Sequence, residues 1–127
     1  MNDKQALVLF AHGARDPRWA QPFEKLQAIA QQRLEGVQVE LAFLELMEPR
    51  LPATIDRLAD DGCLSIRVVP VFLGQGGHVL RDLPPMIEEL RLRHPQVQIS
   101  VADAVGENPE VLQAIAAYCV GSLMSAS

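Results

Sequence analysis

Two histidines follow apolar stretches of the chain at points where a strand would end. His12 comes directly after the apolar run 7–11, and His78 follows a second run through the glycine-rich turn 74–77. A short apolar run that ends near glycine is typical of a buried strand entering a loop. Ligands of open α/β sheets bind beyond the carboxyl ends of the strands, so both imidazoles can face one crevice. Imidazole is the commonest protein metal ligand and titrates near neutral pH, so the pair indicates metal or proton chemistry.

Further polar residues and glycines follow the same apolar runs. Arg15 can hold a substrate carboxylate through two hydrogen bonds, or it can pair with Asp16 or Glu45 on the surface. Glu45 can be a base, a metal ligand or a solvated strand end. Gly76 and Gly77 favour close approach of a flat or anionic ligand to the backbone, or they only give the loop flexibility. The glycine spacing matches neither a Walker loop nor the dinucleotide GxGxxG motif.

The third histidine and the two cysteines are interpreted as structural. His94 precedes Pro95 at the end of a predicted helix, where the helix dipole favours a cation. Cys63 and Cys119 belong to no CxxC pair, so a thiolate zinc site is disfavoured. Both cysteines are expected to be small apolar side chains of the interior.

The spacing of the apolar residues predicts four strands that alternate with four helices. The strands are expected at 5–11, 37–44, 64–73 and 97–102, and the helices at about 17–35, from 49 or 52 to 61, at 80–93 and at 109–123. Strict alternation with short connections predicts an α/β fold, a four-stranded parallel sheet flanked by helices on both faces. One domain is expected over 1–127, with its core at about 5–123 and a frayed end.

Composition and charge exclude several classes of partner. The chain has 127 residues, 49% of them hydrophobic, and a formal net charge of −5. Nucleic acid is not an expected partner, because binding phosphates requires a basic surface. No apolar run approaches the roughly 18 residues that span a bilayer, so no membrane contact is expected. The first residues lack the features of a secretory signal, and a cytoplasmic protein is expected.

Three segments resemble signatures of the class II tetrapyrrole chelatases. The sequence His-Gly-Ala-Arg at 12–15 resembles the family's His-Gly-Ser-Arg, and 70–84 resembles its second signature. The segment 43–49 is similar to the stretch between them. The resemblance covers about 5–122 and is strongest to the short, single-domain sirohydrochlorin cobaltochelatases of the CbiX type. One departure is Ala14, where the family usually has a hydroxyl residue.

The resemblance implies a flavodoxin-like chelatase fold and the insertion of Co²⁺, or in relatives Fe²⁺ or Ni²⁺, into sirohydrochlorin, a polycarboxylated tetrapyrrole. It implies that His12 and His78 are the catalytic, metal-binding residues. The metal is a substrate, and no organic cofactor is expected. The residues expected to contact the macrocycle are Arg15, Glu45, Gly76, Gly77 and Arg81. Longer members join two such domains around one site, so the short form is expected to pair as a homodimer.

Two other functions remain open at the level of the sequence. A domain of this type can carry a metal or a tetrapyrrole without catalysing insertion, and the alanine at position 14 favours that reading. A flavin-binding domain is the weaker alternative, because the first loop lacks the Ser/Thr-rich cradle that a flavin phosphate needs. A chelatase turns over many equivalents of product, whereas a carrier binds its cargo stoichiometrically.

Overall fold

The computed structural model describes residues 4–74 and 76–125, and for His78 and Leu80 it describes the backbone alone. Within these ranges, four strands alternate with four α-helices, and two short 3-10 helices (η) lie among them. The elements are β1 (Gln5–Ala11), η1 (Pro17–Ala20), α1 (Gln21–Gln32), β2 (Val37–Phe43), α2 (Leu51–Asp60), β3 (Ser65–Pro70), α3 (Gly77–Arg93), β4 (Gln98–Val101), η2 (Val105–Glu107) and α4 (Pro109–Ser125).

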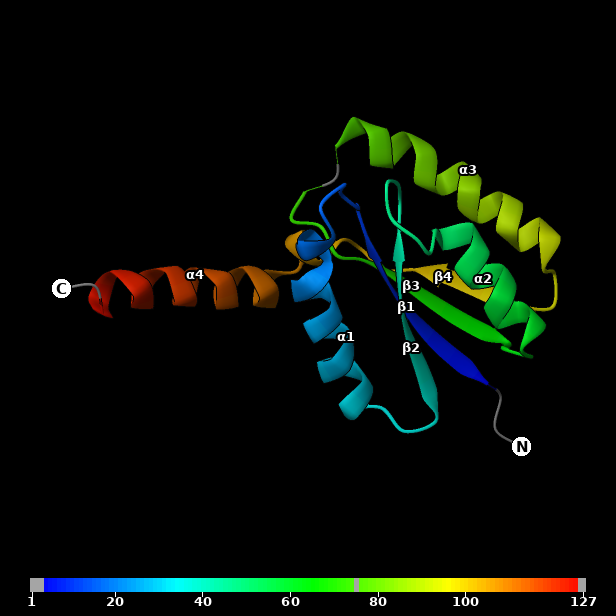
Figure 1. Cartoon of the computed structure of the whole chain (residues 1–127), viewed down its shortest axis with the longest axis horizontal. Helices are drawn as coiled ribbons and strands as arrows, with labels where there is room; N and C mark the ends of the chain where they lie inside the picture. The colour runs from blue at the N-terminus through cyan, green and yellow to red at the C-terminus, as the bar shows by residue number, and fades with distance from the viewer. Residues whose placement is uncertain (1–3, 75, 126–127) are drawn as a thin grey trace.

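The strands form one parallel sheet in the order β2-β1-β3-β4. Helix α1 lies on one face of the sheet, and α2 and α3 lie on the other (Figure 1). The predicted α/β fold with a four-stranded parallel sheet is therefore confirmed. Since β1 has neighbours on both sides and helices over both faces, its sequence is apolar throughout its buried length.

Two apolar clusters lie on the two faces of the sheet. Successive side chains of a strand point to opposite faces, so β1 contributes to both clusters. Val8 and Phe10 are fully buried and pack with Ile55 of α2. Leu9 packs on the other face with Trp19, at the start of the segment that leads into α1. These two clusters fix the carboxyl end of β1 between the helical layers.

The first predicted helix, 17–35, is divided in the structure. The Asp16 side chain caps η1 by accepting a hydrogen bond from the Arg18 backbone N–H at 2.9 Å. The α-helix begins only at Gln21, with Pro22 in its first turn. Proline has no N–H to donate to the carbonyl four residues earlier, so it begins a new helix instead of continuing the old one.

The third strand is shorter, and the third helix longer, than the sequence predicts. Strand β3 ends at Pro70, not at 73, because the chain leaves the sheet there and enters a loop. Helix α3 begins at Gly77, not at 80, and continues through Pro84 and Pro85. The extra first turn is anchored by Val79, whose side chain is buried in the core.

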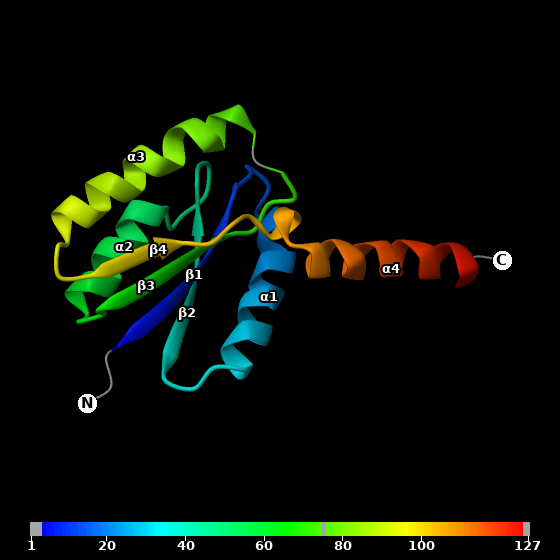
Figure 2. The same cartoon turned by 180° about the vertical axis from the view of Figure 1, so that it is seen from behind.

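The last helix covers neither face of the sheet, unlike the flanking position that the sequence predicts. Asn108 caps α4 by accepting hydrogen bonds from two backbone N–H groups, those of Glu110 and Val111. The helix then runs away from the body on the side that carries α1 (Figures 1 and 2). The last residues expected to fray, 126–127, lie outside the described part of the chain.

Among the described residues, no helix combines the length and the apolar character that crossing a membrane requires.

Candidate functional site

The carboxyl end of β1 lies where the connections of the sheet change direction. From β1 the chain reaches β2 on one side through α1, while β3 lies on the other side of β1 and is reached through α2. Because α1 and α2 lie on opposite faces, the end of β1 is a topological switch point, the position at which the ligand crevice of open α/β sheets is found. His12 is the first residue after β1 and therefore lies at this position.

The backbone around His12 is fixed by hydrogen bonds to the β2 side. The Glu45 N–H donates to the His12 carbonyl at 3.1 Å, and the Leu44 N–H donates to the Ala11 carbonyl at 2.9 Å. Gly13 has a φ of +98°, and a Cβ there would lie 1.8 Å from the Glu45 carbonyl oxygen. Only glycine fits this position, so the loop holds His12 in place while its side chain remains exposed.

The imidazole of His12 is supported from the β3 side by an aromatic ring. The rings of His12 and Phe72 meet edge to face, with centroids 5.7 Å apart. Phe72 also meets Phe10 edge to face at 5.7 Å, and its carbonyl accepts a hydrogen bond from the Gly106 N–H at 2.9 Å. A Cβ on Gly106 would lie 1.7 Å from the carbonyl oxygen of Leu73. Glycine is therefore required here too, and it ties the loops after β3 and β4 together.

The second histidine begins α3, on the same edge of the sheet. His78 lies in the first turn of α3, after the loop that leaves β3, and β3 is the neighbour of β1. The His78 side chain lies outside what the structure describes, so the meeting of the two imidazoles stays a prediction. A Cβ on Gly76 would meet no atom within 4 Å, and one on Gly77 would meet only Arg81, at 3.9 Å. The fold itself does not require these two glycines, and the space beside them is open.

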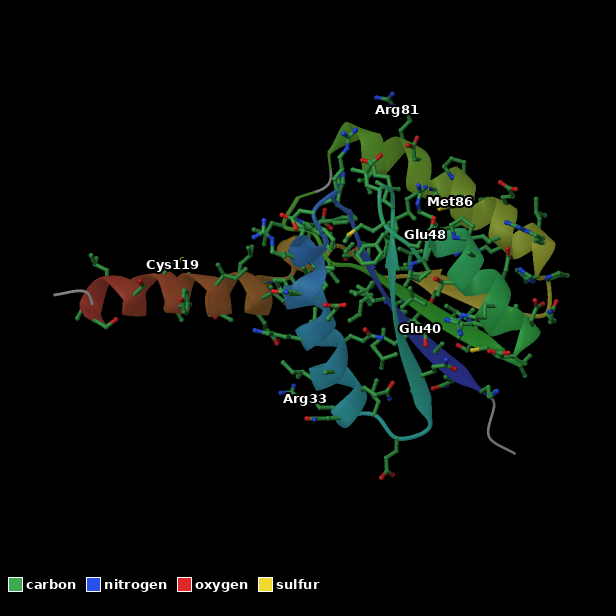
Figure 3. The ribbon with its side chains drawn as sticks, in the orientation of Figure 1. Arg33, Glu40, Glu48, Arg81, Met86 and Cys119 are labelled. Atoms are coloured by element: carbon green, nitrogen blue, oxygen red, sulfur yellow. The ribbon has the colours of Figure 1, made fainter. Side chains whose placement is uncertain are left out.

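A cleft of about 530 Å³ lies between the loop after β2 and helix α3. Its lining residues are Leu44, Glu45, Arg50, Pro52, Asp82, Pro85, Met86 and Glu89. Figure 3 shows Met86 on the side of α3 that faces this loop, whereas Arg81 projects from the outer surface of the same helix. Glu45 thus belongs to the cleft, and Arg81 does not. Among the described side chains, no three His, Cys, Asp or Glu residues are grouped as a metal site.

The family model CbiX matches residues 6–119, which is most of the chain. The chain belongs to the CbiX family. A sirohydrochlorin cobaltochelatase of Methanopyrus kandleri is 39% identical over 82 residues, which are 65% of this chain and 57% of that protein. A sirohydrochlorin ferrochelatase of Bacillus subtilis is 32% identical over 119 residues, which are 88% of this chain and 43% of that protein.

Solved structures of CbiX-like proteins share the fold. A CbiX protein from Marinobacter aquaeolei VT8 superposes with a TM-score of 0.83 at 36% identity, covering 94% of this chain and 98% of that one. The sirohydrochlorin chelatase SirB from Bacillus subtilis subspecies spizizenii, in complex with cobalt, superposes with a TM-score of 0.77 at 28% identity. That match covers 90% of this chain and 49% of SirB. The chain thus spans about half the length of several proteins that it resembles.

The sequence offered Asp16 and Glu45 as alternative surface partners of Arg15. Asp16 pairs with Arg18 at 2.7 Å. The Arg18 guanidinium lowers the pKa of the Asp16 carboxyl below its ordinary value. Arg15 itself is exposed in the loop after His12. Its contact with a ligand carboxylate stays a prediction.

The third histidine of this CbiX-family chain has a structural position, as the sequence predicts. His94 ends α3, at the end of the helix remote from His78. Its Nε2 lies 2.6 Å from Oδ1 of Asp56 in α2, and Arg93 donates to the other oxygen of Asp56 at 3.0 Å. His94 therefore links α2 to α3 and lies away from the crevice.

Sequence reasoning missed the residues that support the site from behind. The sequence did not assign Phe72, which contacts the His12 ring, or Met86, which lines the cleft beside α3. The apolar run predicts a strand to 73 but does not indicate which aromatic rings Phe72 contacts, so the sequence carried no signal for this role.

Proposed function

We propose that this protein is a sirohydrochlorin chelatase, which inserts Co²⁺ or, as related substrates, Fe²⁺ or Ni²⁺ into the macrocycle. The observation that carries the proposal is the exposed His12 ring at the crevice of a CbiX-family sheet. Relatives named sirohydrochlorin cobaltochelatase and ferrochelatase support both the substrate and the reaction type. SirB structures with cobalt and with Fe³⁺ support a first-row metal. The reaction belongs to tetrapyrrole synthesis of the cobalamin or siroheme type, and the cytoplasmic location stays a prediction.

The chemistry assigned to the two histidines follows from the reaction. Metal insertion removes two protons from pyrrolic nitrogens while a hydrated divalent ion loses water and gains four nitrogen ligands. A neutral imidazole can accept such a proton or hold the ion. We assign these tasks to His12 and His78, which the backbone places beyond neighbouring strands. Imidazole suits cobalt, iron and nickel alike, so ligand type alone does not select the metal.

Residues around His12 suit a flat, polycarboxylated substrate. Leu46 follows β2 and Leu73 follows β3, so they flank the end of β1 on both sides. Their exposed fractions, 51% and 66%, leave apolar surface for the faces of a macrocycle. Arg15 and Arg81 are proposed to bind carboxylates at its rim, Arg81 from the outer surface of α3. Glu45 and the open backbone at Gly76 and Gly77 complete the proposed contacts.

Two copies of the chain are proposed to form the working enzyme. The chain covers 49% of SirB and 43% of the Bacillus subtilis ferrochelatase, so two copies match the length of such a protein. The crevice at β1 is open to solvent in one copy. A homodimer therefore supplies a second wall for a substrate as large as a tetrapyrrole.

The proposal is tested by metal insertion in vitro. Purified protein is mixed with sirohydrochlorin and Co²⁺, Fe²⁺ or Ni²⁺ without oxygen, and absorbance follows the metallated product. Many equivalents of product per chain are expected. His12→Ala and His78→Ala are each expected to lower the rate by about 10²–10⁴-fold, as for loss of a positioned acid–base group. His94→Ala is the matched control, expected to keep turnover because His94 binds Asp56 instead.

A carrier without catalytic activity is the competing function, and the same assay separates the two. A carrier binds metal or tetrapyrrole stoichiometrically and leaves the uncatalysed insertion rate unchanged. If the native chain is inert with all three metals and Ala14→Ser creates turnover, the chain is a carrier. If either histidine variant retains native turnover with an unchanged circular dichroism spectrum, that histidine has no catalytic role.

A further inference from the structure

Helix α4 exposes an apolar surface that the chain itself does not cover. From 111 to 125 it contains no Asp, Glu, Lys or Arg. Every residue of the helix is exposed except Val111, which is half-buried. The large side chains involved, with their exposed fractions, are Leu112 47%, Ile115 40%, Tyr118 78%, Val120 61%, Leu123 77% and Met124 79%. A helix that is apolar on most sides is normally buried, so α4 requires a partner.

One side of α4 is continuously apolar, although other apolar side chains lie outside it. Residues spaced by three or four positions share one side of a helix. One side therefore carries the stripe Leu112, Ile115, Cys119 and Leu123. The opposite side carries Gln113, Ala117 and Gly121. Figure 3 shows Cys119 on the projecting part of the helix, away from the body. The stripe is therefore a continuous apolar side on which α4 can dock.

On the side of α1, part of the sheet is covered by no helix of the same chain. In β3, the residues Ile66, Val68 and Pro70 are buried under α2 and α3. The alternate positions of β3 and β4 face the other way. They are Ser65, Arg67, Val69, Gln98 and Ser100, joined by Ala102 just after β4, all exposed or half-buried. We call this area the open face.

The orientation of α1 about its own axis leaves apolar side chains beside the open face. Gln27 donates to the Val39 carbonyl, and the Gln31 side chain bonds to the backbone of both Val37 and Val39. These bonds fix one flank of α1 to the edge strand β2. The other flank carries Leu26 and Ile29, exposed by 38% and 49%, on the side of the open face. Two apolar side chains therefore border it.

The dimensions and chemistry of α4 fit this area. A helix of 17 residues is about 25 Å long, and the six residues of β3 extend about 20 Å. Arg67 is the one charged residue among the open-face positions described above. Its aliphatic stem can lie along an apolar helix, and its guanidinium favours the carbonyl end of a helix. Neither the stripe nor the open-face positions include a carboxylate.

We propose that α4 of one copy lies on the open face of a second copy, and that the second copy returns the same contact. The start of α4 is fixed by Gly106, which admits no Cβ, and by the Asn108 cap, and from there the helix runs away from its own sheet. A reciprocal contact is the usual form of a symmetric dimer. Two helices and two faces can approach the roughly 800 Å² per partner of a standard interface.

This exchange has a consequence for the site, although it does not rest on the proposed reaction. Helix α4 begins at the carboxyl edge of its own sheet, beside the loop after β3. Helices on parallel sheets run antiparallel to the strands, so α4 reaches the partner's sheet at its carboxyl edge. Both carboxyl edges, each with its His12 loop, are thereby brought to one side of the dimer.

The mass of the particle in solution tests the exchange. Light scattering and sedimentation are expected to give a dimer for the native chain and a monomer for Ile115→Glu with Leu123→Glu. Gln113→Glu with Ala117→Glu, which adds the same charges to the opposite side, is expected to remain a dimer. A monomeric native chain, or a dimer that survives the stripe variant, overturns the proposal. So does a monomeric native chain that cosediments with phosphatidylcholine vesicles, because α4 then binds lipid.

Crosslinking tests which face receives the helix. Cys63→Ser with Arg67→Cys leaves one new thiol near the middle of β3 and the native Cys119 near the middle of α4. Mild oxidation is expected to give a covalent dimer on a non-reducing gel. Glu88→Cys in place of Arg67→Cys, exposed on α3, is the control and is expected to give none. A disulfide within one chain, or equal crosslinking of both variants, overturns the proposed contact.

Discussion

The loop that holds His12 depends on one position where no side chain fits. At Gly13 the backbone has a φ of +98°, and the Glu45 carbonyl would lie 1.8 Å from a Cβ. Gly13→Ala is therefore expected to lower the free energy of unfolding by more than the roughly 1–3 kcal/mol of a left-handed non-glycine residue. Urea denaturation measures this loss.

The matched control for this loss is Gly36→Ala. Gly36 has a φ of +73°, but a Cβ there meets no atom within 4 Å. Gly36→Ala is therefore expected to lower the free energy of unfolding only by the cost of a left-handed backbone at a non-glycine residue. Equal losses for the two variants would mean that the loop relaxes and that contact with Glu45 does not fix it. His12 could be located from sequence because it follows an apolar run, but the Glu45 carbonyl beside Gly13 belongs to the loop after β2, a contact between segments far apart in the sequence.

At the scale of elements, α1 is fixed to the sheet through an edge strand. Strand β2 has one neighbour, and the Gln31 side chain binds the backbone of Val37 and Val39 at its free edge, at 2.8 and 2.9 Å. Gln31→Ala is expected to lower the free energy of unfolding by about 1–3 kcal/mol, since two hydrogen bonds are lost. Gln32→Ala, one position on and exposed, is expected to change it by less than about 0.5 kcal/mol. A thermal or urea denaturation series distinguishes them, and equal effects would contradict this role of Gln31.

The sequence predicted these elements unequally well. The expected strand at 5–11 coincides with β1, because its apolar run is bounded by polar residues on both sides. The start of α3 was missed, because its first turn depends on burial of Val79 against other elements. The position of α4 could not be predicted, since its apolar pattern shows that the helix needs cover but not which surface supplies it. The sequence located the His12 loop only because it follows an apolar run. The contact of His12 with Phe72 depends on how β1 and β3 lie side by side, which the sequence does not show.

At the scale of the whole molecule, the two cysteines report whether α4 is covered. Cys63 is buried, and burial raises the pKa of its thiol above the ordinary value. Less thiolate is then present near pH 8, so Cys63 is expected to react slowly with a thiol reagent and faster as the pH rises toward that pKa. Cys119 is exposed in a single copy, but it lies on the stripe that the proposed dimer covers.

The rate of thiol labelling in the native fold therefore differs between dimer and monomer. In the native dimer both thiols are expected to react slowly near pH 8. In Ile115→Glu with Leu123→Glu, one equivalent per chain is expected to react fast, and Cys119→Ser is expected to abolish that fast phase. Dilution of the native chain below its dissociation constant is expected to produce the same fast phase, since mass action exposes the stripe. Fast labelling of Cys119 in the concentrated native chain would show that α4 remains uncovered, whatever the mass of the particle, because a stripe packed against a second sheet cannot admit the reagent.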